Sequence, residues 1–403
     1  MTEAGLTAAS GGATGGSERL HGYRRTPPLP ERPGISAPDA PAEPPTRLGT
    51  DQPRLALRGL ILIVPLFVLL AFGAGGPERS LQTLAPVTTF ALPAIAMVAF
   101  YWEDWPGSSL RAGWAGLTDT LLLVAAAPVL SVAGQAVVAE VDLPALFGFE
   151  PGAGHVAMFP HTMPLAAGAF TVILQLTLVT EGWPLRGLGR VPSGIVALLV
   201  SWVIGAALYF TLLDVHGEPA TTPGGLHELS GPVAPGAYGA WLTSVGAWQL
   251  VFFLALRGWP FSGIRRRAPR LLAGNVAVIA CGWATYLILR HGLDWTPNRV
   301  FAVCGSVIAA ILVVAMLFEA WPWTRLFSPL PGRLSVLITA LVLTGVLYGV
   351  LSAVARHAQW SHENPDDWIG YAVLNALGMS VILHVAIWRR WPVATGTTGN
   401  RTA

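Results

Sequence analysis

Long apolar runs separated by short polar segments dominate the chain from residue 55 onward. Each run is close to the roughly 20 residues that a helix needs to cross about 30 Å of hydrocarbon. The runs lie at about 55–75, 83–102, 115–139, 160–181, 191–213, 236–256, 270–291, 298–320, 332–355 and 367–388. An isolated strand or loop in lipid would leave backbone groups without hydrogen bonds, so we expect helices. The pattern predicts an all-α, polytopic transmembrane helix bundle of about ten spans.

A Trp-Pro motif follows every second run, with Glu or Arg two residues before the Trp. The motif is repeated as WEDWP at 102–106, TEGWP at 180–184, LRGWP at 256–260, FEAWP at 318–322 and WRRWP at 388–392. This period predicts five helical hairpins, each ending in the motif. Trp prefers the headgroup level and Pro disfavours helix in the residue before it, so we interpret the motif as an anchor and a stop. A gate formed by the five motifs is the alternative interpretation.

The termini differ in composition from the apolar region. Residues 1–53 are rich in Pro, Gly, Ala, Ser and Thr and lack an apolar period, which predicts a disordered tail. This tail is too long for a typical cleaved signal peptide, so we expect the first span to be a permanent anchor. The expected organisation is a tail at 1–53, a ten-span transmembrane domain at 54–392 and a short disordered tail at 393–403.

Composition supports the membrane class. The chain is 53% hydrophobic and 11% charged, with a mean hydropathy of +0.56, whereas soluble proteins have about 25% charged residues. The expected partner is therefore the lipid bilayer. Cys281 and Cys304 both lie in apolar runs, where we expect them to be small core residues rather than a disulfide or a thiolate.

The distribution of arginine predicts the orientation. All 24 basic residues are Arg, and only four of them, Arg79, Arg290, Arg299 and Arg356, fall on the side of the ten-span arrangement opposite the motifs. Cytoplasmic segments retain positive charge. We therefore expect a protein of the cytoplasmic membrane with both termini in the cytoplasm and every Trp-Pro motif at the inner interface.

A few polar residues inside the spans are the candidates for chemistry, since such groups are costly in lipid. The candidates for contact with a solute are Asp119, Gln135, Gln175, Asn275, Asn375 and His384. For Asp119 the alternatives are a hydrated carboxylate and a proton or cation site. For the amides, hydrogen bonding between helices is the commoner use. His384 lacks a second histidine at its depth, so the sequence supports haem ligation poorly.

Histidines also gather on the predicted outer side. The segment HVAMFPHTM offers imidazole and thioether groups, a ligand set that suits copper. Its candidate metal ligands are His155, Met158, His161 and Met163. The spacing matches no established metal template, so the sequence requires no cofactor.

Several function classes are disfavoured by the motifs that the sequence lacks. It contains no phosphate-binding loop, no G-x-S-x-G elbow and no H-E-x-x-H helix, so we do not expect an enzyme of those types. The basic cluster at 265–267 and 270 indicates topology and lipid contact rather than nucleic-acid binding. The leading hypothesis is a permease or carrier for a small solute. The alternatives are a metal-binding or redox membrane protein that uses the outer His and Met residues, and a non-catalytic scaffold or assembly factor.

Overall fold

The computed structural model describes residues 51–138, 141, 143–144, 162–215 and 229–394. Within these residues every regular element is a helix, and the only bridges are two isolated ones, near 213–214 and 230–233. Nine of the described helices are long and apolar enough to cross a membrane. The all-α class predicted from the apolar runs is therefore confirmed, and the helices indicate an integral membrane protein.

The long helices follow the predicted runs closely. Several continue into a π-helical turn, which carries the η label given after the helix. In chain order they are α1 (Arg54–Phe72), α2 (Pro77–Ala96) with η1 (Met97–Tyr101), α3 (Ala112–Val138), α5 (Met163–Leu174) with η5 (Gln175–Val179), α6 (Arg190–Leu212), α7 (Pro235–Leu250) with η7 (Val251–Ala255), α8 (Arg267–Leu287) with η9 (Ile288–Gly292), α9 (Pro297–Ile311) with η10 (Leu312–Leu317), α11 (Pro329–His357), and α12 (Pro365–Tyr371) with η11 (Ala372–Gly378), α13 (Met379–Ile382) and η12 (Leu383–Ile387).

Two of the ten predicted spans differ from expectation. At the fourth, the described helix Met163–Val179 is apolar but shorter than the nine long ones. The second starts at Pro77, six residues before the predicted 83. Gly75 and Gly76 directly before it adopt φ values of 106° and 120°, which turn the chain, and Pro77 at the first helical position suits a helix start.

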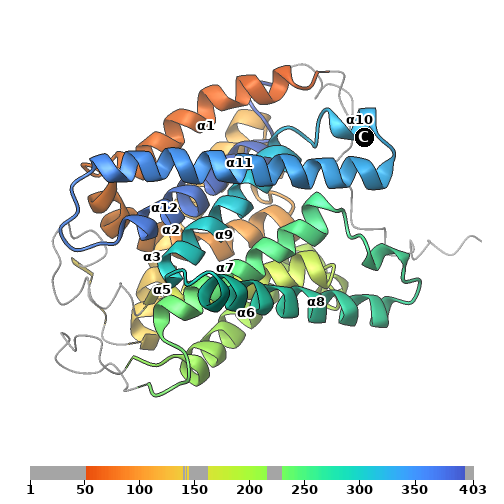
Figure 1. The fold of residues 1–403 in the computed structure, drawn as a ribbon. Helices are drawn as coiled ribbons and strands as arrows, with labels where there is room; N and C mark the ends of the chain where they lie inside the picture. Colours follow the sequence, from red (N-terminus) through yellow and green to blue (C-terminus); the bar gives the residue numbers. More distant parts are fainter. Residues whose placement is uncertain (1–50, 139–140, 142, 145–161, 216–228, 395–403) are drawn as a thin grey trace, which may run out of the picture. The chain divides into compact units, whose positions relative to one another are not determined.

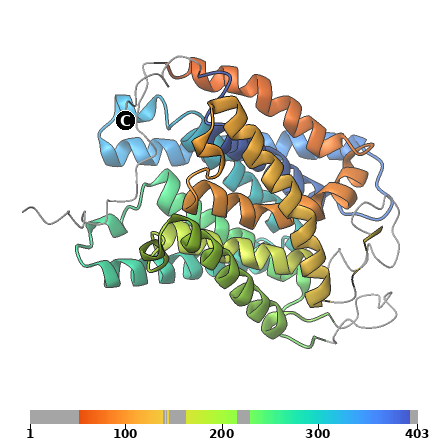
Figure 2. The same cartoon turned by 180° about the vertical axis from the view of Figure 1, so that it is seen from behind.

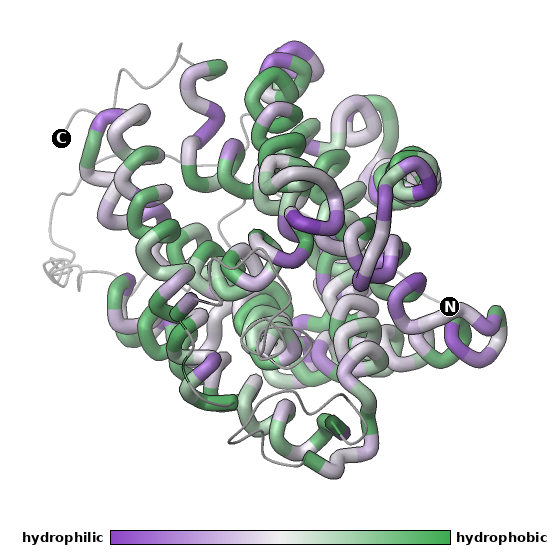
Figure 3. Tube along the Cα trace, turned by 90° about the vertical axis from the view of Figure 1, so that its left-hand side faces the viewer, coloured by the Kyte–Doolittle hydropathy of each residue, from purple (hydrophilic) through white to green (hydrophobic). Residues whose placement is uncertain are grey.

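The helices that precede a Trp-Pro motif are the more deeply buried ones. In Pro77–Tyr101, 72% of the most apolar window is buried inside the protein, and in Pro365–Ile387 67% is buried. In α1, α6 and α11 the corresponding share is only 22%. Helices with this much exposed apolar surface are expected to face lipid. Figure 3 shows apolar residues, in green, on outer as well as inner helices.

The buried helices form a closed ring. α2 packs against α5, α5 against α7, α7 against α9, α9 against α12, and α12 against α2. Outer helices pack on the ring: α3 on α2, α6 on α5, α8 on α7, and α11 on α9 and α12. Figure 1 shows α1 and α11 on one side and α6 and α8 on the other, and Figure 2 shows α3 on the opposite face. The first outer helix, α1, packs on η11 of the last span.

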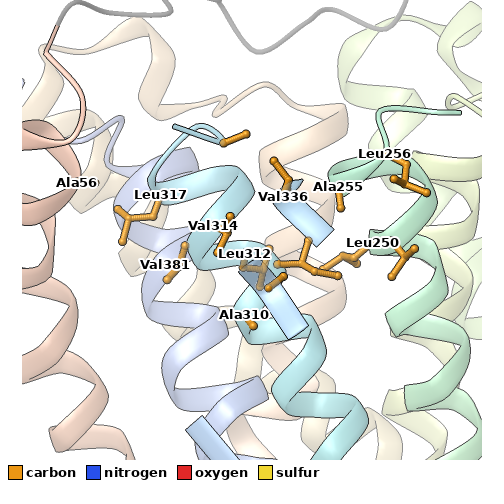
Figure 4. Packing of buried hydrophobic residues seen from close by; sticks show 14 of the residues in the cluster. Ala56, Leu250, Ala255, Leu256, Ala310, Leu312, Val314, Leu317, Val336 and Val381 are labelled. Carbon is orange, nitrogen blue, oxygen red and sulfur yellow. The ribbon is translucent and has the colours of Figure 1, made fainter. Parts of the chain in front are cut away.

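Apolar side chains from several spans meet in the largest core cluster, near the ends of the helices that carry the motifs. Leu250 and Ala255 come from α7 and η7, Leu312 and Leu317 from η10, and Val336 from α11 (Figure 4). Within a membrane, lipid tails are as apolar as these side chains, so such contacts stabilise the bundle through van der Waals packing. This packing places the motif ends of the helices side by side.

The five Trp-Pro motifs share one backbone path. In each, the Trp-Pro peptide bond is cis and the two residues before the Trp have positive φ values. In every motif a π-helical turn ends four residues before the Trp of the cis bond, and the same hydrogen bonds recur. In the last motif, for example, the Trp388 amide donates to the Leu383 carbonyl at 2.8 Å and the Arg390 amide donates to the His384 carbonyl at 2.8 Å. The sequence repeat is thus also a repeat of local structure.

Candidate functional site

Three amide side chains form a hydrogen-bonded chain between α7, η5 and α8. Gln249 Nε2 donates to Gln175 Oε1 at 2.7 Å and to the carbonyl oxygen of Thr171 at 3.0 Å. Gln175 Nε2 donates to Asn275 Oδ1 at 2.8 Å, and Asn275 Nδ2 donates to the Leu271 carbonyl at 2.7 Å. The hydrogen bonds thus run in one direction: Gln249 donates to Gln175, and Gln175 donates to Asn275. The structure therefore joins two of the predicted residues, Gln175 and Asn275, through a contact that runs from the inner ring to the outer helix α8.

One end of this amide chain has an unused acceptor. The Gln249 side chain is fully buried, and its Oε1 accepts no hydrogen bond from the described residues. Buried polar atoms in proteins are nearly always hydrogen-bonded. A carbonyl oxygen can only accept, so the group that complements Gln249 is a donor such as a hydroxyl or an amino group.

Asn375 lies at a different place, where the last span meets α2. Its Nδ2 donates to Thr89 Oγ1 at 2.7 Å and to Thr88 Oγ1 at 3.0 Å. Asn375 is in η11, and such π-helical segments recur at functional sites. Both hydrogens of the Asn375 amide are donated to α2, so this side chain holds the last span against α2. This agrees with the helix-packing interpretation of intramembrane amides.

Asp119 lies near the motif end of α3 and is fully buried. Its Oδ1 accepts a hydrogen bond of 2.9 Å from the Gly107 amide, while its Oδ2 has no hydrogen-bond partner among the described residues. Gly107 begins the short 3-10 helix η2 (Gly107–Ser109), directly after the first Trp-Pro motif. The turn after the motif therefore covers the Asp119 carboxyl group. Whether Asp119 is a hydrated carboxylate or a proton or cation site stays a prediction.

An ion pair joins the first and last motifs beside Asp119. Arg389 Nε lies 2.7 Å from Asp104 Oδ2, and the two side chains are 47% and 13% exposed. Burial raises the pKa of the Asp104 carboxyl, and the Arg389 guanidinium lowers it. Arg190, at the start of α6, donates to the Trp102 and Glu103 carbonyls of the same first motif.

Arg390 makes a second, more buried link. Its guanidinium donates to the Leu317 carbonyl at 3.0 Å and to the Met316 carbonyl at 2.9 Å, and it pairs with Glu319 at 2.8 Å. The carbonyls at the end of η10 have no helical partner, so a cation stabilises them. Burial lowers the pKa of Arg390, and Glu319 raises it.

His384 and Gln135 are the remaining predicted residues. The His384 ring is almost fully buried and its Nε2 has no hydrogen-bond partner among the described residues. It lies against α1, where a Cβ on Gly59 would be only 2.7 Å from Nε2. Gln135 is fully buried in α3. Among the described contacts of the six predicted residues, a hydrogen bond joins Gln175 to Asn275; a polar path through all six stays a prediction.

The predicted metal ligands fall mostly outside the described residues. His155, Met158 and His161 lie there, and Met163 is the first residue of α5, where it packs against apolar side chains. The described part of the chain contains no group of three or more His, Cys, Asp or Glu residues arranged to hold a metal ion. The outer metal site stays a prediction.

The sequence reasoning missed Gln249, Asp104, Arg389 and Arg390. Gln249 carried the same signal as the predicted amides, because it is an uncharged polar residue inside the run at 236–256, and a uniform survey of such residues would have found it. The two arginines were interpreted only as topology signals, and their acidic and carbonyl partners lie up to 286 residues away in the sequence.

The arrangement provides amide groups within the helix bundle and a buried carboxylate beside an ion pair at the motif end. These groups can bind a polar solute and a proton, respectively. The chain matches no family model, and no curated protein or solved structure is significantly similar to it.

Proposed function

We propose that the protein is a carrier of the cytoplasmic membrane for a small, neutral or weakly charged solute that presents a hydroxyl or amino donor. The amide chain of Gln249, Gln175 and Asn275 contributes the binding groups. The unused acceptor of Gln249 is the single observation that carries this proposal. A buried acceptor without a partner costs about 1–3 kcal/mol, and a solute donor that pairs with it recovers this free energy.

The position of the amide chain also supports transport. Gln175 lies on the inner ring at the first residue of a π-helical turn, and Asn275 lies on the outer helix α8. A solute bound there would contact two ring helices and one outer helix. Small changes in the packing of these helices would alter the pairing of the amides, which gives the site a way to bind and release.

The uptake of small solutes into proteoliposomes tests this function. We expect vesicles containing the purified protein to take up one or more members of a panel of polyols, amides and neutral amino acids faster than empty vesicles. Gln249→Leu removes both the acceptor and the donor to Gln175 while keeping a similar volume. We expect about a tenfold loss of uptake rate, the equivalent of one hydrogen bond of about 1.4 kcal/mol.

A matched variant separates this site from general damage. Gln82→Leu removes an amide from α2 that bonds Glu363 at 3.3 Å and is not a member of the amide chain, and it should leave uptake unchanged. Equal uptake by wild type and Gln249→Leu, or no uptake of any solute by wild type, would contradict the proposal.

We further propose that the five Trp-Pro hairpins are repeats of one unit with the motifs at the cytoplasmic interface. Four of the motif tryptophans are between 38% and 53% exposed, which suits side chains at the headgroup level. The arginine excess on this side supports the same orientation, with both termini in the cytoplasm.

A further inference from the structure

We propose that Asp119 is a proton-binding site that couples the carrier to protons. This inference rests on the proposed transport function for its coupling role, although proton binding itself is independent of any solute. The Asp119 side chain is fully buried, and only one of its two carboxyl oxygens accepts a hydrogen bond from the described residues. As an anion it would have little compensation for the loss of water, which is costly for a buried carboxylate.

The cations nearest to Asp119 bind other groups. Arg389 pairs with Asp104 at 2.7 Å. Arg190 donates to Trp102 and Glu103 carbonyls and, at 2.8 Å, to Ser108 Oγ. The positive charges of Arg389 and Arg190 therefore act on Asp119 from nearby, but neither guanidinium forms a described ion pair with it.

The neutral acid fits the local geometry. A Cβ on Gly107 would lie 2.3 Å from Asp119 Oδ2 and 2.5 Å from the Ala115 carbonyl oxygen, so both oxygens lie against Gly107. Ala115 precedes Asp119 by one helical turn. A proton on Oδ2 has the Ala115 carbonyl of the preceding turn as the acceptor on the same side of Gly107, while Oδ1 keeps its bond to Gly107.

The elements packed on α3 bring few other titratable groups to Asp119. η2 and the first motif supply Asp104, η12 and the last motif supply Arg389, and α6 supplies Arg190. The charged residues of α2, Glu78 and Arg79, lie at its opposite end. The histidine of η12, His384, lies against Gly59 of α1 instead.

The proton has a consequence for the contacts between motifs. With Asp119 neutral, Arg389 pairs with Asp104 and joins the first motif to the last. When Asp119 gives its proton to the aqueous phase at the exposed Glu103 and Ser109, its new negative charge attracts Arg389 and Arg190 away from their partners. Proton release therefore loosens the contact between the two motifs, and proton binding restores it.

Infrared difference spectra of the purified, full-length protein at a series of pH values test the proton site. We expect wild type at neutral pH to show the carbonyl stretch of a protonated carboxylic acid, and Asp119→Asn to lose it. The amide oxygen of Asn still accepts from Gly107, so the fold is preserved. Asp294→Asn, at a carboxylate whose side chain is 97% exposed, should leave the band unchanged. Identical bands in wild type and Asp119→Asn at every pH would overturn the site.

Carbodiimide labelling of wild type needs no variant. Dicyclohexylcarbodiimide adds a protonated carboxyl group across one C=N bond: the carboxyl oxygen bonds the central carbon, the acid proton moves to nitrogen, and the adduct rearranges to a stable N-acylurea. Mass spectrometry should locate this adduct on Asp119, with a yield that falls about tenfold per pH unit once the pH exceeds the pKa of the group. An adduct on Asp104 with none on Asp119 would also overturn the proposal.

Coupling is tested separately, with the solute that wild-type vesicles take up. A pH gradient should drive accumulation by wild type, whereas Asp119→Asn should exchange solute across the membrane without responding to the gradient. An unaltered response in Asp119→Asn would overturn the coupling role. If wild type shows the infrared band and the adduct but moves no solute, the transport function fails and the proton site stands.

Discussion

At the scale of single residues, adjacent arginines of the last motif have different roles. Arg390 is 11% exposed and binds two carbonyls and Glu319 of the neighbouring motif. Arg389 is 47% exposed and pairs only with the first motif. Exposed ion pairs contribute about 0–1 kcal/mol, whereas removing one partner of a buried pair costs about 3–5 kcal/mol.

We expect Arg390→Gln to lower the free energy of unfolding by about 3 kcal/mol and Arg389→Gln by less than about 1 kcal/mol. Arg390→Gln leaves Glu319 and two helix-end carbonyls without their cation, which is the physical reason for its larger effect. Thermal unfolding of both variants in the same detergent measures the difference. Equal losses would show that burial does not distinguish the two arginines.

Residue roles were the least predictable part of this chain. The polarity of Gln175 and Asn275 inside apolar runs marked them as candidates, and the structure places them in contact. The same criterion marked Asp119, with a hydrated carboxylate and a proton or cation site as the alternatives. Its burial could not be predicted, because the turn after the first motif that covers it has no periodic pattern. Hydrogen bonds across 74 to 290 residues of sequence, such as those of Gln249 and Asn375, depend on packing that one sequence does not reveal.

At the scale of helices, the apolar runs predicted nearly every element, because the thickness of the bilayer fixes the length of a span. Glycine then determines how closely helices approach. On Gly205 of α6, a Cβ would lie 2.7 Å from the backbone nitrogen of Ala169 and 3.0 Å from its Cα, in α5. These are backbone atoms, so they cannot move aside as a flexible side chain could.

We expect Gly205→Ala to destabilise the protein by about 1–3 kcal/mol, since the added methyl group forces α5 and α6 apart. Gly345→Ala is the matched control. Gly345 also lies within a long apolar helix, α11, but no atom lies within 4 Å of its Cβ position. The control should be neutral or stabilising by up to about 1 kcal/mol, because alanine favours helix. Chemical unfolding of the two variants compares them, and equal stability would contradict the close contact.

At the scale of the whole described bundle, the ring of buried helices was not predicted. The sequence showed a period of two spans, but the period alone does not reveal which member of each pair is inner. Hydrophobicity does not identify the inner helix of each pair either, since lipid-facing and buried helices are both hydrophobic. Burial in the structure supplies the distinction: the helices that end in a motif are inside.

The orientation of the bundle gives the prediction at this scale. In a background with Cys281→Ala and Cys304→Ala, we expect a membrane-impermeant maleimide to label Ser361→Cys in intact cells and Ser109→Cys only after lysis. Both positions are exposed and flank opposite ends of the helix formed by α2 and η1. Labelling in the reverse order would invert the proposed topology.

The closure of the ring between α12 and α2 has a consequence for biosynthesis. Thr88, Thr89 and the Ala71 carbonyl bond Asn375 and Trp368 of the last span, which the ribosome makes almost 300 residues later. The first two spans therefore wait in the membrane, with the Ala71 carbonyl and the acceptor sites of the two threonine hydroxyls unmatched, until the final segment has been inserted. A chain that stops before residue 365 can insert most of its helices but cannot finish its first two, so a truncated product leaves polar groups open to recognition by membrane quality control.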